Sequence, residues 1–238
     1  MSKKPFFPAV QPNRKLGQYI LVSQSALAAE LSLAELSEHD TVLEIGAGPG
    51  NLTGLIAQRC HVIAVEKDRR FLPQLEKLPR TTVIHGDALE VLAHAPAFNK
   101  IISNIPYALS QPLLLMLLKM QWERAVLIVQ KEFAEKLITP TKLGMLLSGC
   151  ASVAVAAHVS RQDFYPAAPY DSSIVVIDQQ QPMDERFWKF LSPIYRERNR
   201  DVRNVLKDFP QELARKKVHQ LTYEEIKALY EMNNSNLL

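Results

Sequence analysis

The stretch Thr41-Val42-Leu43-Glu44-Ile45-Gly46-Ala47-Gly48-Pro49-Gly50 combines two patterns that together decide the fold. Its first half is short, mostly apolar and rich in β-branched residues, as in a buried strand. Its second half is a glycine-rich turn, in which residues without a Cβ let the backbone approach a ligand closely and bend sharply into a helix. We therefore expect a strand, a ligand-binding turn and a helix that begins near Asn51.

The sequence on the C-terminal side of this stretch repeats the same strand–helix unit. Strand-like apolar runs occupy residues 61–66, 81–85, 100–103 and 125–129. Segments of helical periodicity, such as residues 69–78 and 111–120, lie between them. Strands that alternate with helices indicate a parallel sheet covered on both faces. Two later β-rich stretches, residues 148–159 and 172–177, are expected to form an antiparallel pair that closes the sheet edge. The predicted fold class is α/β with a Rossmann-like sheet.

The C-terminal part of the chain has a different character. From Pro182 the sequence consists of amphipathic helical segments, interrupted by Pro193 and Pro210. We predict a catalytic domain at residues 1–181 and a small all-helical domain at residues 182–238.

Positive charge is concentrated in this second domain. Residues 186–217 contain ten Lys or Arg and four Asp or Glu, an excess of six, whereas the whole chain carries a net charge of +3. The remaining residues are therefore net negative by three. A basic segment beside an acidic body predicts a polyanionic partner such as nucleic acid. A solvated basic helix face explains this observation equally well when it is taken alone.

Composition excludes several other classes of protein. The longest unbroken apolar run is residues 113–118, far short of the roughly 20 residues that span a bilayer. No apolar stretch of secretory type follows the N-terminal lysines. The two cysteines are expected to be reduced, and the six histidines lack metal-ligand spacing. We expect a cytoplasmic protein without membrane association or a metal site.

Three acidic residues stand at strand ends around the glycine turn. Glu44 precedes Gly46 by two positions, and Glu66 ends the next strand, where a carboxylate can accept hydrogen bonds from both hydroxyls of a ribose. Asp87 follows the third strand, in position to meet an adenine amine. The Gly-x-Gly-x-Gly spacing differs from the Gly-x-Gly-x-x-Gly of dinucleotide-binding folds. This set favours an S-adenosylmethionine site and disfavours the alternative of a nicotinamide-dependent oxidoreductase.

Asn104-Ile105-Pro106-Tyr107 follows the fourth strand and predicts the site of methyl acceptance. The N6 amine of adenine is a poor nucleophile, because its lone pair is delocalised into the ring. The Asn104 side-chain oxygen and the Ile105 carbonyl can each accept one N6–H bond and so orient the nitrogen for in-line displacement. Pro106 fixes the turn, and Tyr107 offers a ring on which a base can stack.

Taken in order, these motifs resemble those of the ribosomal RNA adenine N6,N6-dimethyltransferase family over nearly the whole chain. The segment Leu16-Gly17-Gln18-Tyr19-Ile20-Leu21 is similar to the family signature Leu-Gly-Gln-Asn-Phe-Leu. The remaining matches, in family order and spacing, are the cofactor turn, Val65-Glu66-Lys67-Asp68, Gly86-Asp87-Ala88, Asn104-Ile105-Pro106-Tyr107, Val129-Gln130-Lys131-Glu132-Phe133-Ala134 and Phe164-Tyr165-Pro166. The segment from Arg198 to Leu206 resembles the arginine motif of small-subunit members, particularly archaeal ones.

The resemblance implies a class I methyltransferase that takes its methyl group from S-adenosylmethionine. The implied substrate is a pair of adjacent adenosines near the 3′ end of small-subunit rRNA, each methylated twice during ribosome biogenesis. The implied partner is the immature small ribosomal subunit, and we expect the free protein to be a monomer.

These implications assign roles to three groups of residues. The predicted cofactor-binding residues are Gln18, Tyr19, Leu21, Glu44, Gly46, Gly48, Glu66, Lys67, Asp87, Ala88 and Asn104. The predicted catalytic residues are Asn104, Ile105, Pro106, Tyr107 and Phe164, with Phe164 stacked on the flipped adenine opposite Tyr107. The predicted RNA-binding residues are Arg196, Arg198, Arg200 and Arg203.

The chain departs from the family pattern at several positions. Tyr19 stands where the family has Asn, Ser23 where it commonly has Asp, and Ala168 where it has a second proline. The stretch of residues 139–144 is shorter than in the family, and the C-terminal domain is smaller than is usual there. Two alternatives remain: a large-subunit rRNA methylase of the erythromycin-resistance type, and a non-catalytic nucleic-acid-binding factor descended from such an enzyme. The intact acidic and Asn104 positions argue against the second.

Overall fold

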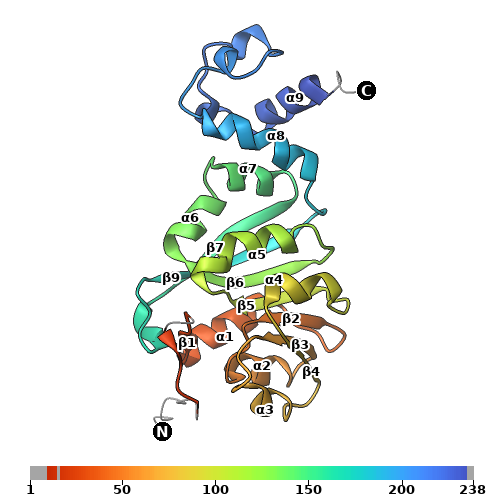
Figure 1. Ribbon diagram of the computed structural model, residues 1–238, viewed down its shortest axis with the longest axis vertical. Coiled ribbons are helices and arrows are strands. Elements are labelled where there is room, and N and C mark those ends of the chain that lie inside the picture. Colours follow the sequence, from red (N-terminus) through yellow and green to blue (C-terminus); the bar gives the residue numbers. More distant parts are fainter. Residues whose placement is uncertain (1–9, 15–16, 235–238) are drawn as a thin grey trace. The chain divides into compact units, whose positions relative to one another are not determined.

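The computed structural model describes residues 10–14 and 17–234 (Figure 1). The chain divides into two compact units. The first unit contains the described residues up to Ala134 together with Ala154–Gln179. The second unit contains Glu135–Val153 and the described residues from Gln180 onward. None of the helices within these described ranges is long and apolar enough to cross a bilayer.

A seven-stranded sheet with the order β4-β3-β2-β5-β6-β9-β7 forms the centre of the first unit (Figure 1). Its strands are β2 (Thr41–Ile45), β3 (His61–Glu66), β4 (Thr81–His85), β5 (Lys100–Asn104), β6 (Arg124–Gln130), β7 (Ala151–Val159) and β9 (Ser172–Gln179). The first five are parallel, and β9 runs antiparallel to β6. Strand order reverses at β2, which lies between β3 and β5. Ligands of open α/β sheets bind at such a switch point, beyond the carboxyl ends of the strands.

The remaining elements of the first unit are mostly short. Its helices are α1 (Gln24–Leu33), α2 (Asn51–Ile56), α3 (Leu72–Leu75), α4 (Ala88–Val91) and α5 (Ser110–Leu117), and α6 (Lys131–Leu137) continues into the second unit. The Ser23 hydroxyl caps α1 by accepting the Ala26 N–H, so it performs the N-cap role for which Asp is equally suited.

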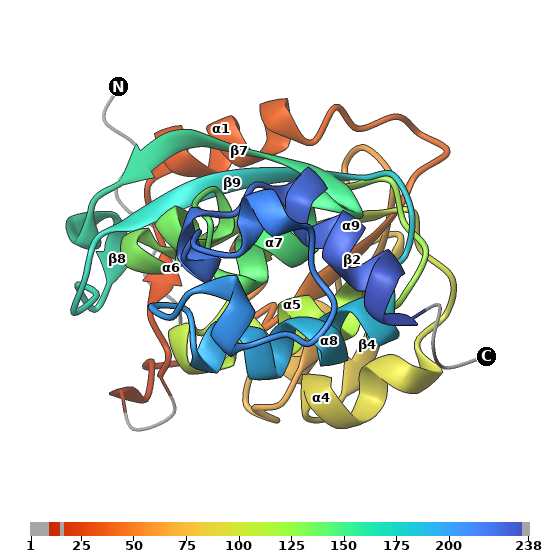
Figure 2. The same cartoon turned by 90° about the horizontal axis from the view of Figure 1, so that it is seen from above.

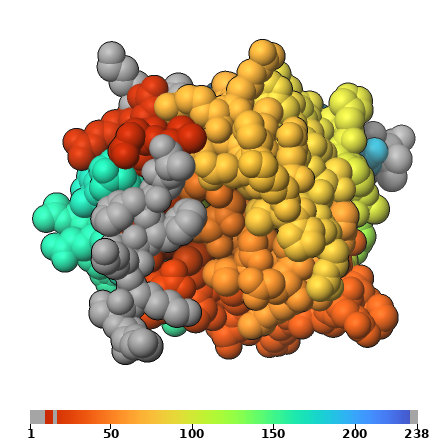
Figure 3. All heavy atoms as spheres, turned by 90° about the horizontal axis from the view of Figure 1, so that it is seen from below, coloured from red at the N-terminus to blue at the C-terminus, as the bar shows by residue number. Residues whose placement is uncertain are grey.

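The N-terminal segment is joined to a distant part of the chain by a small antiparallel sheet. Strand β1 (Ile20–Leu21) pairs with β8 (Phe164–Tyr165), with Leu21 opposite Phe164. In Figure 3 the red segment before α1 accordingly lies beside the blue-green segment that contains β8.

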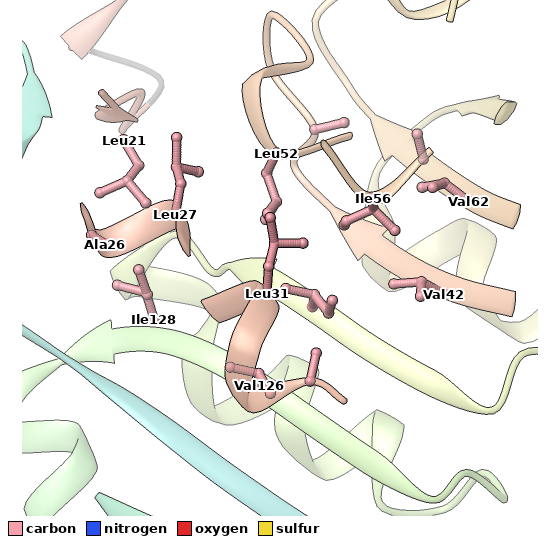
Figure 4. Close-up of a cluster of buried hydrophobic side chains, with 14 of the residues drawn as sticks. Leu21, Ala26, Leu27, Leu31, Val42, Leu52, Ile56, Val62, Val126 and Ile128 are labelled. Carbon is pink, nitrogen blue, oxygen red and sulfur yellow. The ribbon is translucent and has the colours of Figure 1, made fainter. Parts of the chain in front are cut away.

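Buried apolar side chains from the helices and from the strands meet in one core. The helices α1 and α2 pack on the sheet through residues at helical spacing, and the strands contribute residues that alternate (Figure 4). The central members are Leu27, Leu31, Val42, Leu52, Ile56, Val62, Val126 and Ile128. Strands covered on both faces have nearly continuous apolar sequences, which is why the runs at β3 and β6 predicted buried strands.

The five predicted parallel strands and the closure of the sheet edge by β9 and β7 are confirmed. One prediction was wrong in its first residues. Ser148 does not begin a strand but ends the helix α7 (Lys142–Ser148), and β7 starts at Ala151. Thr141 caps α7 by accepting the Gly144 N–H, and the apolar residues that follow are buried as a helix. The predicted helices near residues 69–78 and 111–120 are observed as the shorter α3 and α5.

The second unit is helical beyond β9. Its long helices are α8 (Glu185–Arg196) and α9 (Tyr223–Asn234), joined by the single turns Val202–Asn204, Gln211–Leu213 and Val218–Gln220 (Figures 1 and 2). The Phe187 ring packs edge-on against Tyr223 and Tyr230 of α9. This unit also contains residues 135–153, which the sequence analysis placed in the catalytic domain. The assignment of catalysis to residues 1–181 and of RNA binding to residues 182–238 stays a prediction.

Glu30 on α1 is a carboxyl group buried inside the first unit. It has no solvent-exposed surface, and neither of its oxygens has a hydrogen-bond partner. Burial and the nearby Glu44 raise the pKa of Glu30 well above its usual value. The folded protein therefore binds a proton at Glu30 that the unfolded chain releases above about pH 4.3. The stability that this proton supports is complete below that pH and is lost as the pH rises.

We predict that Glu30→Leu stabilises the protein and that the gain grows with pH. Removing an unpaired buried polar group is expected to add on the order of 1–3 kcal/mol to the free energy of unfolding at pH 8. Thermal unfolding from pH 5 to pH 9 measures the effect, with the exposed Glu38→Gln as control. A Glu30→Leu variant whose melting temperature falls with pH as steeply as that of the wild type contradicts this account of Glu30.

Candidate active site

A cavity of about 890 Å³ opens at the carboxyl ends of β2, β3, β4 and β5 in the first unit. This volume lies within the range of small-molecule sites. Every predicted cofactor and catalytic residue lines it: Gln18, Tyr19, Leu21, Glu44, Gly46, Gly48, Glu66, Lys67, Asp87, Ala88, Asn104, Ile105, Pro106, Tyr107 and Phe164. The structure thus brings these residues together, and the individual roles stay predictions. Leu16 of the N-terminal signature lies outside the described residues.

The glycine turn after β2 forms one wall of the cavity. Gly46 and Gly48 have φ angles of 74° and 55°, in the left-handed region that side chains with a Cβ rarely adopt. A Cβ added at either residue has no close neighbour, the nearest atom being 4.0 Å away. Backbone conformation, rather than lack of space, is therefore what demands glycine at these two positions.

Glu66 is held at the end of β3 by two backbone donors. Its Oε2 accepts the Gly48 N–H at 2.7 Å and its Oε1 accepts the Asp68 N–H at 2.7 Å. Because a carboxylate oxygen can accept more than one hydrogen bond, both oxygens remain able to bind ribose hydroxyls. The fixed carboxylate is therefore oriented before any ligand enters.

Asp87 and Lys67 form an ion pair beside this carboxylate. The Lys67 Nζ lies 2.7 Å from Asp87 Oδ2, and Asp87 Oδ1 accepts the Leu89 N–H at the start of α4. The hydrogen bond from Lys67 lowers the pKa of Asp87. Asp87 is therefore an ionised acceptor at neutral pH and can accept a hydrogen bond from an adenine amine.

Gln18 attaches the N-terminal segment to the loop after β3. Its Nε2 donates to Asp68 Oδ2 at 2.7 Å, and its Oε1 accepts the Asn13 N–H at 2.7 Å. Hydrogen bonds from Arg70 and then from Gln18 hold the pKa of Asp68 well below its usual range. Gln18 thus lines the cavity and also fixes the position of Tyr19, which follows it.

Three buried oxygens along the cavity have no hydrogen-bond partner. They are Glu44 Oε2, Asn51 Oδ1 and Asn104 Oδ1. Buried polar atoms are nearly always hydrogen-bonded, so each exception requires an explanation. The two amide oxygens are acceptors, and Glu44 Oε2 is an acceptor when the carboxyl group is ionised, so the set calls for a ligand rich in donors. S-adenosylmethionine has an ammonium, two ribose hydroxyls and an adenine amine, and a target adenine adds its N6 amine, so the residues present fit both.

Asn51 was missed by the sequence analysis. It is the first residue of α2, directly after the glycine turn, and its Nδ2 donates to the Leu21 carbonyl at 3.1 Å. Its Oδ1 has no hydrogen-bond partner, and Asn51 lines the cavity. A polar amide at the first position of the helix after such a turn was the available signal.

The methyl-acceptor motif lies where β5 ends. Asn104 is the last residue of β5, and the Ile105 N–H donates to the Ile128 carbonyl at 3.2 Å. The Tyr107 hydroxyl is hydrogen-bonded to Ser172 Oγ at 2.8 Å and donates to the Tyr170 carbonyl at 3.4 Å. Burial raises the pKa of Tyr107. Its ring is therefore neutral and held in one position.

The four arginines predicted to bind RNA lie in the second unit, at the end of α8 and in the turns that follow. All four are exposed. Arg200 pairs with Glu197 at 3.4 Å and Arg203 with Asp201 at 3.5 Å. Within residues 10–14 and 17–234 no group of three or more His, Cys, Asp or Glu side chains could hold a metal ion.

A family model described as ribosomal RNA adenine dimethylase matches residues 9–236. The chain belongs to this family. A relative from Thermococcus gammatolerans, described as a probable ribosomal RNA small subunit methyltransferase A, is 35% identical and covers 91% of this chain and 87% of its own length. A protein of the same description from Thermococcus sibiricus is 31% identical, covering 96% and 95%.

Solved structures show the same fold at lower identity. A dimethyladenosine transferase from Plasmodium falciparum has a TM-score of 0.79 at 22% identity, covering 91% of this chain and 98% of its own. The 23S rRNA methyltransferase ErmE has a TM-score of 0.72 at 22% identity, covering 90% and 98%. The predicted family, the class I methyltransferase fold and S-adenosylmethionine as methyl donor are confirmed.

The protonation state of Glu44 decides how this carboxyl group interacts with a positively charged ligand. Burial, and to a lesser degree the Glu66 carboxylate, raises its pKa to about 8 against the opposing effect of hydrogen bonding to Thr53. Below pH 8 Glu44 therefore carries a proton in the empty site. A positively charged ligand favours the ionised form, so its binding releases this proton.

We predict that the affinity for S-adenosylmethionine rises as the pH increases from about 6 towards 8, because less work is then needed to ionise Glu44. Calorimetry in buffers of different ionisation enthalpy measures the proton released. Glu44→Gln is the control, since it retains the ligand's own titration and removes that of Glu44. Equal proton release in the wild type and in Glu44→Gln shows that Glu44 does not ionise on binding.

Proposed function

We propose that this protein transfers methyl groups from S-adenosylmethionine to N6 of two adjacent adenosines near the 3′ end of small-subunit rRNA, acting on the immature small subunit. The observation that carries the proposal is the unpartnered Asn104 Oδ1 at the end of β5. It lies in the same cavity as Glu44, Glu66 and Asp87, the acceptors suited to the cofactor. An unpaired hydrogen-bond acceptor beside the binding site of the methyl donor suits a substrate that carries an amine.

The chemistry needs orientation more than a base. The bound cofactor supplies a methyl group on a positively charged sulfur. The neutral thioether that remains after transfer is an excellent leaving group. Asn104 Oδ1 accepts one N6–H bond and the Ile105 carbonyl accepts the other, which directs the nitrogen lone pair towards the methyl carbon. These fixed acceptors also stabilise the positive charge that develops on the nitrogen. The proton leaves to solvent after transfer.

A base that is paired or stacked in RNA cannot bring its N6 to a buried site, so the adenosine must flip out. Tyr107, anchored through Ser172, offers one ring for the extruded base. Phe164 is predicted from the sequence to supply the second ring. In the structure Phe164 lines the cavity and is 6% exposed.

The small subunit is favoured as the target by the archaeal relatives described as small subunit methyltransferases and by the arginine motif from Arg198 to Leu206. The large-subunit alternative shares every catalytic motif, and ErmE shares the fold. The intact set of acceptors argues against a factor that only binds nucleic acid, because such a factor has no use for buried unpaired oxygens.

The function is tested by incubating the protein with radiolabelled S-adenosylmethionine and immature small or large subunits and mapping the label. We expect label on adenosine N6 in the small subunit. Asn104→Ala should lower the rate by on the order of 10² or more, because one of the two acceptors that orient N6 is lost. RNA affinity should change little. The exposed Gln162→Ala is the matched control, and near-normal turnover by Asn104→Ala removes Asn104 from the proposed role.

The basic segment yields a separate prediction. Replacing Arg196, Arg198, Arg200 and Arg203 by Gln should weaken subunit binding and flatten its dependence on salt, since each phosphate contact contributes roughly 0.7–0.9 to the slope. Binding assays from low to high salt measure this slope, with Lys227→Gln on α9 as control. An unchanged slope means that these exposed side chains are solvated and do not contact RNA.

A further inference from the structure

A lysine side chain lies between α7 and α8 without an acidic partner. Lys142 is the first residue of α7, and its Nζ lies 3.3 Å from the centre of the Trp188 ring and donates a hydrogen bond to Ser192 Oγ. Both helices belong to the second unit, in which they lie side by side (Figure 1). The sequence analysis placed Lys142 in the catalytic domain and gave it no role.

The face of α8 that meets Lys142 carries a second cation. Trp188, Ser192 and Arg196 follow one another at intervals of four residues, so they lie along one face of the helix. Ser192 Oγ donates its own hydrogen to the Trp188 carbonyl at 2.9 Å and is therefore the acceptor towards Lys142. Arg196 is exposed, and the other three residues are only partly buried. A ligand from solution can therefore reach both positive groups.

These two cations repel each other in the unbound protein. Burial, and then repulsion from Arg196, lowers the pKa of Lys142, and no acidic group opposes the shift. Within the part of the second unit that the structure describes, neither Lys142 nor Arg196 forms an ion pair. By contrast, Arg200 lies 3.4 Å from Glu197. An anion placed beside Lys142 and Arg196 removes their repulsion and favours the charged lysine.

The available donors suit a phosphate group. An ammonium group has three N–H donors, and Ser192 accepts one of those of Lys142. Arg196 adds a guanidinium group, whose charge-assisted hydrogen bonds to phosphate are stronger than those between neutral groups. Residues 186–217, which include this face of α8, contain ten Lys or Arg and four Asp or Glu. Such an extended excess of positive charge favours a polyanion over a single free anion.

We propose that Lys142, Ser192 and Arg196 form a site for one phosphate group of the RNA backbone, with the Trp188 ring supporting the lysine. This inference rests on the proposed function, because it takes rRNA as the ligand. The RNA-contacting surface of the second unit then extends beyond the arginine-rich turns to α7, which precedes the edge strand β7 in the chain.

The test compares Lys142→Met, which keeps an apolar side chain over Trp188 and removes the charge, with Lys142→Arg, which keeps the charge. Lys142→Met should weaken binding to immature small subunits and lower the slope of log affinity against log salt by roughly 0.7–0.9, as the loss of one phosphate contact does. Lys142→Arg should retain the wild-type slope. Lys227→Met is the matched control, because it removes an exposed charge of the same sign from α9. The affinity for S-adenosylmethionine should stay the same in all three variants.

A second readout uses the wild-type protein and therefore does not depend on the folding of a variant. Lysines are acetylated in solution with and without bound RNA, and the modified positions are identified by mass spectrometry. RNA should protect Lys142 and leave Lys227 reactive. Inorganic phosphate at the same concentration of phosphate groups should protect Lys142 little, because a single anion lacks the other contacts of a polyanion.

Two results overturn the phosphate site. The first is an unchanged salt slope in a Lys142→Met variant that melts earlier, which means that Lys142 only joins α7 to α8. The second is protection of Lys142 by inorganic phosphate but not by RNA, which assigns the site to a free anion. If the wild type labels the large subunit, the proposed function fails, and the same slopes are then measured on that subunit to decide on the site. Label on the small subunit with an unchanged slope overturns the site alone.

Discussion

The two backbone hydrogen bonds that the Glu66 carboxylate accepts are the interaction on which the rest of the site depends. By accepting the N–H groups of Gly48 and Asp68, the carboxylate joins the glycine turn after β2 to the loop after β3. The glycine turn leads directly into α2, which begins at Asn51. Asp68 accepts a hydrogen bond from Gln18 and so anchors the segment that carries Tyr19. One side chain, 7% exposed, thereby links the glycine turn to the loop after β3, and through Asp68 to the segment that carries Gln18.

Buried carboxyl groups are concentrated at and near the site. Burial, and then repulsion from Glu66 for Glu44 and from Glu44 for Glu30, raises the pKa values of Glu44 and Glu30 and keeps protons on them. Such an arrangement reduces the stability of the empty protein. It also makes the cavity selective, because a cation or a multiple donor relieves the strain and a neutral acceptor does not.

Local patterns explain how much of this architecture could be predicted from sequence. The five parallel strands and the acids at their ends were predictable, because strand periodicity and the position of Glu66 and Asp87 depend on neighbouring residues alone. The helix at residues 142–148 was not, since a run of apolar residues suits either a buried strand or a buried helix. The orientation of the Asn51 side chain depends on its hydrogen bond to the Leu21 carbonyl, thirty residues away. Contacts between residues that are distant in the sequence can be identified only once the fold is known.

The pairing of β1 with β8 has a consequence for how the protein matures. Residues 20 and 21 meet residues 164 and 165, so the segment that carries Tyr19 has no partner strand until more than two-thirds of the chain has been synthesised. Loop-closure entropy makes such distant pairing slow compared with the local strand–helix units. A nascent chain can therefore assemble its glycine turn and central strands on the ribosome while the cavity is still open on one side. The part of the cavity lined by β1 and β8 is therefore completed late in the synthesis of the chain.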